Sequence, residues 1–436
     1  MLRNRRRGSV RIGIFPYLDP NGGGIYQYSL SILKSLENWK TEDELLLVSL
    51  WGTQSIPRYL DLRKWEIRSL DWNPPPTKPL DNLRRVIGEG PHRDAWRFLR
   101  KKLRQRFSSA CVRPELKPAF HELRLDLTLY AWPNTLSFEA GIPFVMAIHD
   151  VQHRLHPEYP EVSANGEWES REYCFRNGSR HATLLLADSE IGREDILQCY
   201  QAYGVTPDRV KILPFVPACY LNKDDSKIDG ERVRERYRLP KRYLFYPAQF
   251  WPHKNHLRII RALKLLRDAR DVEVRIVFCG SQTGEIRQHT FRQVIDLCAQ
   301  LGVEKQVYYL GYVPDKDISA IYGGSAGLVM PSFFGPTNIP VLEAWAHACP
   351  VLTSDIRGIR EQVGDAGILV DPISVEALAD GMYRLWTDET LASSLAQRGL
   401  QRLTRYTADD FGQRLIDILE EAKARVRQAQ SERVST

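Results

Sequence analysis

The residues best suited to chemistry lie in one stretch, residues 331–354, which reads PSFFGPTNIPVLEAWAHACPVLTS. An apolar run at 327–330 predicts a strand before it, and a short apolar helix with a single carboxylate, Glu343, follows the turn. Thr337 or Asn338 can cap that helix, and Pro340 suits its first turn. Because the first N–H groups of a helix have no partner within it and the helix dipole is positive there, this turn predicts a binding site for a phosphorylated ligand.

Two more turns with suitable chemistry follow predicted strands. A lysine, Lys254, follows the predicted strand at 243–247, where an ammonium can neutralise phosphate oxygens, although a lysine in a polar turn is often only solvated. The second turn follows the predicted strand at 10–15 and contains Gly22, Gly23 and Gly24. Glycine lets a backbone approach a ligand closely, and the spacing of these three glycines is not the GxGxxG of a dinucleotide site.

A histidine, His149, follows a further predicted strand at 143–148. Doubly wound sheets place ligands at the carboxyl ends of their strands, so this residue is a candidate for ligand contact. Asp150 can orient the same loop by capping. We expect His153 and His156 behind the site or on the surface.

The length and composition limit the class of protein. A chain of 436 residues predicts two domains, and 43% hydrophobic with 26% charged residues is typical of a globular protein. No apolar run is long enough for a transmembrane helix, and MLRNRRR lacks the apolar segment of a secretory signal. The 7 cysteines show no CxxC spacing. We therefore expect a cytoplasmic protein without a metal site or disulfide framework.

The net charge of +7 is concentrated in part in residues 84–106. Trp96, Leu99, Leu103 and Phe107 recur there at helical spacing, so a helix would carry an apolar stripe beside a cationic face. Such a helix can lie on the anionic inner face of a membrane, or it can pack on its own domain. No nucleic-acid-binding module accompanies the charge, so we expect no nucleic-acid partner.

Part of this sequence resembles the C-terminal half of the GT-B glycosyltransferases. The resemblance lies in residues 331–354, in SDIRGIRE at 354–361 and in GDAGILVDP at 364–372. The resemblance is to the large retaining family 4, also called glycosyltransferase group 1, whose members typically show E-G-F-G-x-P-x-x-E-A here. On this alignment Glu343 matches the second Glu of the E-x7-E motif. Gly335 stands at the position of the first Glu.

The resemblance extends to the other turns. Lys254 and Asn255 match the usual residues of their turn, and Gln249 stands where the family has Arg. An H-D pair after the same strand matches His149 and Asp150. The glycine turn resembles a Gly-Gly loop that faces the donor diphosphate across the cleft.

The resemblance implies an α/β fold of the GT-B type, with two doubly wound Rossmann-like domains facing a central cleft. The alternation of predicted strands and helices, repeated on each side of residue 230, independently indicates two such domains. We expect the N-terminal, acceptor-binding domain at 1–218, an interdomain connection at 219–238 and the nucleotide-sugar-binding domain at 239–405. A helix at 406–428 would return toward the first domain, and a disordered tail would follow from residue 429.

The function implied is a metal-independent, retaining glycosyltransferase without a cofactor. It would move a sugar from a nucleotide-diphosphate sugar, with GDP-mannose one candidate, to a hydroxyl of a glycan or lipid-linked oligosaccharide, as in cell-surface polysaccharide assembly. Glu343 would hold the ribose, Lys254 would stabilise the diphosphate and His149 would contact the donor sugar. The donor site would comprise Gly22, Gly23, Gly24, Gln249, Lys254, Asn255, Thr337, Asn338, Ile339, Pro340 and Glu343.

Two other functions remain open at this point. Gly335 and Gln249 depart from the family pattern, so a catalytically silent scaffold that binds nucleotide sugars is one alternative. Another GT-B enzyme, such as a sugar epimerase or a phosphorylase, is the second. Two carboxylates at glycosidase spacing are not discernible, which disfavours a hydrolase.

Overall fold

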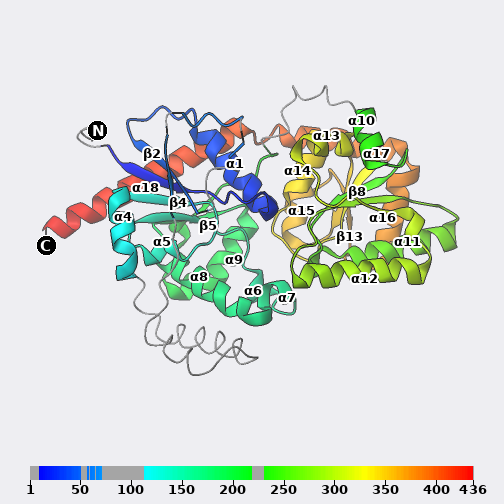
Figure 1. Ribbon diagram of the computed structural model, residues 1–436, viewed down its shortest axis with the longest axis horizontal. Helices are drawn as coiled ribbons and strands as arrows, with labels where there is room; N and C mark the ends of the chain where they lie inside the picture. Colours follow the sequence, from blue (N-terminus) through cyan, green and yellow to red (C-terminus); the bar gives the residue numbers. More distant parts are fainter. Residues whose placement is uncertain are drawn as a thin grey trace.

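The structure is a computed structural model, and it describes residues 9–50, 56–57, 59–63, 65–70, 112–218 and 230–435. Two domains lie side by side, each built around a parallel sheet with helices packed on it (Figure 1). The basic segment at 84–106, with the stripe that ends at Phe107, lies outside the described residues.

The first sheet has seven strands within the described residues, all parallel, in the order β3-β2-β1-β4-β5-β6-β7. Its central strands are fully buried and, apart from one threonine, apolar, as expected for strands covered on both faces. The bounds are β1 Arg11–Phe15, β2 Glu44–Ser49, β3 Glu66–Ser69, β4 Leu127–Tyr130, β5 Phe144–Ala147, β6 Leu184–Ala187 and β7 Val210–Ile212. The helices are α1 Gly24–Leu36, α4 Lys117–Leu123, α5 Leu136–Glu139, α6 Gln152–Leu155, α7 Pro160–Ser163, α8 Glu167–His181 and α9 Glu190–Tyr200.

The second sheet, in the part of the chain that is described, has six parallel strands in the order β10-β9-β8-β11-β12-β13. The bounds are β8 Leu244–Pro247, β9 Ile276–Cys279, β10 Val307–Tyr309, β11 Gly327–Met330, β12 Val351–Ser354 and β13 Ile368–Val370. The helices are α10 Gly230–Tyr237, α11 His256–Arg270, α12 Glu285–Leu301, α13 Asp315–Gly323, α14 Ile339–Ala346, α15 Arg357–Val363, α16 Val375–Thr387 and α17 Glu389–Leu403.

Residues 230–237, which we expected in the interdomain connection, form α10. This helix belongs to the second domain, because Val233 joins that domain's core and Arg236 and Tyr237 both donate hydrogen bonds to Asp317 of α13. The polar composition of the segment reflects one exposed helix face rather than an irregular connection.

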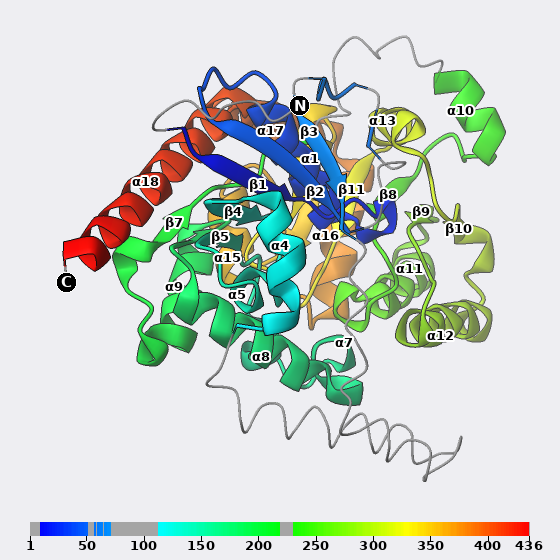
Figure 2. The same cartoon turned by 60° about the vertical axis from the view of Figure 1, so that its left-hand side comes forward.

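The last helix, α18 Ala408–Ser435, leaves the second domain and packs on the first (Figures 1 and 2). Phe411, Leu415 and Leu419 are fully buried in the core of the first domain. The helix continues to Ser435, so the prediction of a disordered tail from residue 429 is wrong. No helix among the described residues is long and apolar enough to span a membrane.

Each sheet changes direction at one point, and the two points face the same cleft. In the first sheet β1 lies between β2 and β4, and in the second β8 lies between β9 and β11. Doubly wound sheets bind ligands beyond the carboxyl ends of the strands at such a point. The glycine turn follows β1, the Lys254 turn follows β8, and the turn at 331–338 follows β11, so the fold brings the three predicted turns to one place.

Candidate active site

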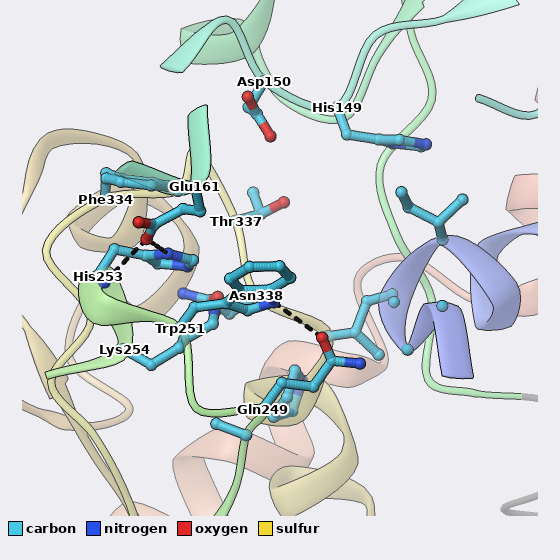
Figure 3. Close-up of a pocket in the computed structure, with 18 of the residues that line it drawn as sticks. His149, Asp150, Glu161, Gln249, Trp251, His253, Lys254, Phe334, Thr337 and Asn338 are labelled. Atoms are coloured by element: carbon cyan, nitrogen blue, oxygen red, sulfur yellow. Dashed lines mark hydrogen bonds and ion pairs between the residues drawn. The ribbon is translucent and has the colours of Figure 1, made fainter. Parts of the chain in front are cut away.

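A cavity of about 530 Å³ lies between the domains at this point (Figure 3). A smaller one of about 180 Å³, also lined by both domains, adjoins it. The two share part of their lining, including Gly23, Gln249 and Ile339. The predicted residues that line the larger cavity are Gly22, Gly23, Gly24, His149, Gln249, Lys254, Thr337, Asn338, Ile339 and Pro340. Glu343 lines the smaller one.

Two helices begin at the cavity. Helix α1 starts after Gly23, whose φ of 59° favours glycine, and α14 starts after Asn338. Gly23 has no side chain with which to cap α1, and the side chain of Asn338 forms no cap hydrogen bond to α14. A Cβ on Gly24 would lie 3.6 Å from Ile339 Cδ1, so the two helix starts face each other closely across the cleft. Their dipoles both favour an anion in the space between them.

The backbone of Asn338 is already paired. Its N–H donates to Gln362 Oε1 at 2.9 Å, and Gln362 Nε2 donates to its carbonyl at 2.9 Å. In this arrangement the amide of Asn338 is held by α15, and any anion contact from α14 has to come from the rest of its first turn. The Asn338 Nδ2 atom is buried without a described partner.

Glu343 is buried on α14, with 6% of its surface exposed. Tyr322 Oη donates to Glu343 Oε2 at 2.8 Å, which fixes the carboxylate at the edge of the smaller cavity. A buried carboxylate held in this way can accept hydrogen bonds from neighbouring hydroxyl groups.

Lys254 ends the short turn Pro252–Lys254 between β8 and α11. Burial lowers the pKa of its ammonium to about 8, although the negative charges of Asp150 and Glu161 act to raise it. Lys254 forms no ion pair within the described part of the chain. A partly buried cation without an ion-pair partner is poised to bind an anionic ligand.

Asn255 and Gln249, both predicted in the donor site, lie in different places and make different contacts. Asn255 is buried away from the cavity, where its Nδ2 donates to Pro331 O at 2.9 Å and Pro372 O at 2.8 Å, and so ties the Lys254 turn to the end of β11. Gln249 spans the cleft, because its Nε2 donates to Asn21 O at 2.7 Å. Asn255 is the one predicted donor-site residue that lines neither cavity.

His149 lines the cavity but points away from Asp150 in Figure 3. Its Nε2 lies 2.9 Å from Ala131 O, and since a carbonyl only accepts, this nitrogen carries the proton. Burial lowers the pKa of the imidazole, so the ring is neutral. The ring of Tyr28 packs on it edge-on at 4.8 Å. His153, expected behind the site, is fully buried and lies 3.4 Å from Glu172.

Three carboxylates of the first domain also line the cavity, and the sequence did not indicate two of them. Asp150 points into it in Figure 3 and caps its own loop through Gln152 N at 3.0 Å, as expected. Glu161 of α7 and Asp188 after β6 were not predicted. Burial raises the pKa of Asp188 to about 7.

These two carboxylates bridge the domains. Glu161 Oε1 accepts from His253 Nδ1 at 2.6 Å and from His253 N at 3.0 Å, whereas its Oε2 is buried without a described partner. Asp188 accepts from the hydroxyl of Thr337. Polar residues 90 or more positions apart therefore meet only because the cleft is closed, and no local pattern marks them.

The backbone conformation at Gly335 explains why this position has no glutamate, unlike the family pattern. Its φ is 131°, a conformation that side-chain-bearing residues rarely adopt, although a Cβ there would make only ordinary contacts, the nearest with Thr337 O at 3.7 Å. A glutamate at this position would strain the present turn, so the chain between Phe334 and Pro336 follows a path suited to glycine.

The two facing doubly wound domains define the GT-B class of fold, and solved structures of that class agree. Anabaena HepE in complex with UDP-glucose superposes with a TM-score of 0.65 at 17% identity, over 95% of this chain and 100% of that one. WaaG, a glycosyltransferase involved in lipopolysaccharide biosynthesis, gives 0.62 at 16% identity, over 93% and 99%. The predicted fold is confirmed.

Residues 229–402, which make up most of the second domain, match the family model described as glycosyl transferases group 1. O-antigen chain mannosyltransferase B of Escherichia coli is 26% identical over 267 residues, 60% of this chain and 66% of that protein. D-inositol 3-phosphate glycosyltransferase of Corynebacterium glutamicum is 26% identical over 254 residues, 57% and 59%. Each match thus spans less than two thirds of the relative's length.

Proposed function

We propose that this chain is a retaining, metal-independent glycosyltransferase with a nucleotide-diphosphate sugar as donor. The observation that carries the proposal is the meeting of the α1 and α14 N-termini with the unpaired Lys254 at one cavity, beside a pocket that holds Glu343. The first arrangement suits a diphosphate and the second suits a ribose. The complex of HepE with UDP-glucose, a protein of the same fold, supports this assignment.

In the proposed complex the nucleoside occupies the smaller cavity, and Glu343 accepts hydrogen bonds from the ribose hydroxyls. The diphosphate lies between the two helix starts and Lys254. Negative charge grows on the diphosphate as the sugar leaves, so these positive groups stabilise the transition state more than the ground state.

The sugar then extends into the larger cavity beside His149 and Asp150. His149 is neutral and its Nε2–H is engaged by Ala131, so the ring positions the sugar by contact and donates no proton. Asp150 supplies an acceptor for sugar hydroxyls, a role that the glycine at 335 cannot fill.

Retention follows from attack on the same face of the sugar that the diphosphate leaves. The bond between the sugar carbon and the phosphate oxygen breaks, the acceptor oxygen bonds to that carbon, and its proton passes to the departing phosphate. This route needs no enzymic nucleophile, which suits a cavity where Gly335 stands at the position of a family carboxylate.

For the substrates we propose GDP-mannose and a hydroxyl of a glycan or lipid-linked oligosaccharide. The similarity to a mannosyltransferase named for O-antigen chains supports both choices. The basic residues of 84–106 would attract the enzyme to the anionic inner face of a membrane, by about 1 kcal/mol per charge near the surface. Binding to anionic vesicles at low salt, lost when Arg97, Arg100, Lys101 and Arg104 are changed to Gln, tests that part.

A nucleotide-sugar-binding scaffold without activity is the second candidate, and Gly335 with Gln249 is the observation that favours it. Incubating the full chain with UDP-, GDP- and ADP-sugars, together with polyprenol-linked and free oligosaccharide acceptors, separates the two. The proposed enzyme produces a glycosylated acceptor with the anomeric configuration of the donor. Binding without turnover across the whole panel favours the scaffold, and inversion contradicts the retaining mechanism.

A further inference from the structure

Arg287, in the first turn of α12, lies at the diphosphate end of the larger cavity, where no sequence pattern places it. Its guanidinium carbon is 4.6 Å from the centre of the Trp251 ring. Its Nη1 donates to Gln249 Oε1 at 3.0 Å. The side chain is thus held in place by stacking on Trp251 and by one hydrogen bond to a neutral acceptor.

Arg287 has no counter-ion in the part of the chain that the structure describes, and its Nε is buried there without a hydrogen-bond partner. Arginine stays charged at any physiological pH. Because a partly buried, unpaired charge is costly, Arg287 should gain considerably from an anion that enters the cavity.

Gln249 holds this arrangement together. Its Oε1 accepts from both Arg287 and Trp251 Nε1, the latter at 2.8 Å, while its Nε2 donates across the cleft to Asn21. The same atom, Nε2, lies 3.8 Å from where a Cβ on Gly23 would be. Arg287, Gln249 and the glycine turn therefore meet on one wall of the space assigned to the diphosphate.

We propose that Arg287 binds the donor diphosphate together with Lys254, and that Gln249 is the residue that positions it. The guanidinium then supplies, from α12, the second positive charge that position 249 lacks. Its planar fork can contact two phosphate oxygens at once. This inference rests on the proposed function, since it assigns a residue to the same donor site.

The test compares Arg287→Gln with Arg292→Gln, a control one and a half turns further along α12 where the side chain is exposed. NMR-detected titration, which reaches millimolar affinities, measures binding of UDP, GDP and ADP and of the corresponding nucleosides. We expect Arg287→Gln to weaken diphosphate binding roughly ten- to a hundredfold while nucleoside binding stays unchanged, as befits one charged contact. Equal losses for both ligands, or no loss, overturn the inference.

A charge relocation makes the test specific. Gln249→Arg in the Arg287→Gln background returns a cation to the same wall, and diphosphate affinity should recover in part. Failure of this double variant to bind better than Arg287→Gln contradicts the electrostatic role. If the unaltered chain binds none of the diphosphates, the proposed function itself fails and takes the inference with it. If it binds them and Arg287→Gln does so equally well, only the inference fails.

Discussion

His253 and Glu161 lie on opposite sides of the cleft and are joined by two hydrogen bonds to a single oxygen. His253 Nδ1 is 2.6 Å and His253 N is 3.0 Å from Glu161 Oε1. Burial lowers the pKa of His253 to about 4, so the imidazole is neutral and donates from Nδ1. Although burial opposes it, these hydrogen bonds lower the pKa of Glu161 and keep it a carboxylate. The Phe334 ring stacks on His253 at 4.1 Å, which seats the pair beside the cavity.

This pair predicts that Glu161→Ala shifts the protein toward an open cleft. Two hydrogen bonds to a charged acceptor are lost, at a cost on the order of 1 to 3 kcal/mol each. Small-angle scattering should show a larger radius of gyration, and turnover should fall, while the melting temperature changes little because each domain keeps its own core. Glu158→Ala removes a nearby exposed carboxylate and should behave as the unaltered chain does. Identical scattering of Glu161→Ala and the control would show that the pair does not hold the cleft closed.

Lys254 predicts how donor binding depends on pH. Burial lowers its pKa to about 8, so the ammonium is present below that pH and is lost above it. The affinity for a nucleoside diphosphate should be level below about pH 8 and fall by up to about tenfold per unit above it, because binding then requires uptake of a proton. Calorimetric titration between pH 6 and about 10 measures this.

Two variants separate the charge of Lys254 from its position. Lys254→Arg keeps a cation that does not titrate and should remove the fall in affinity at high pH. Lys254→Ala should lower turnover by roughly a hundredfold, since the contact strengthens as the diphosphate leaves. If Lys254→Ala turns over as fast as the unaltered chain, the lysine is only solvated and does not stabilise the leaving diphosphate.

Because Glu343 is the proposed ribose contact, we expect its substitution to weaken binding of the nucleoside part of the donor. Glu343→Gln removes the charged acceptor from a buried site and should weaken nucleotide binding by about 1 to 3 kcal/mol while the fold survives. Tyr322→Phe should cause a smaller loss, because it only frees the carboxylate that Tyr322 fixes at 2.8 Å. Unchanged nucleotide affinity in Glu343→Gln would remove it from the donor site.

Metal independence is tested by chelation. The two helix starts and Lys254 offer the positive charge that a divalent ion would otherwise bring to a diphosphate. Activity measured with excess EDTA should equal that of untreated protein. Activity that disappears with EDTA and returns with magnesium or manganese would mean that a metal takes part.

The sequence predicted those parts of the site that depend on local patterns. Strand β11 was predicted with the bounds that it has, and Pro340 falls in the first turn of α14 as expected, because apolar runs, glycine and proline act within a few residues. Glu343 and Lys254 were selected by their place in such turns.

The residues that the sequence missed act over long distances along the chain. Glu161 meets His253 across 92 positions and Asp188 meets Thr337 across 149, and each is an ordinary polar residue in its own segment. Arg287 lies in a polar helix start that resembles any solvated helix. The conformation of Gly335 likewise depends on how its turn packs, which a single sequence does not encode in a recognisable pattern.

A crystal structure of the full chain with a bound nucleoside diphosphate would show directly whether the cleft is the donor site. We expect the ribose hydroxyls on Glu343, and the diphosphate between the starts of α1 and α14 within hydrogen-bonding distance of the Lys254 ammonium. A nucleotide bound elsewhere on the molecule, or one whose diphosphate makes no contact with Lys254 or either helix start, would contradict this expectation.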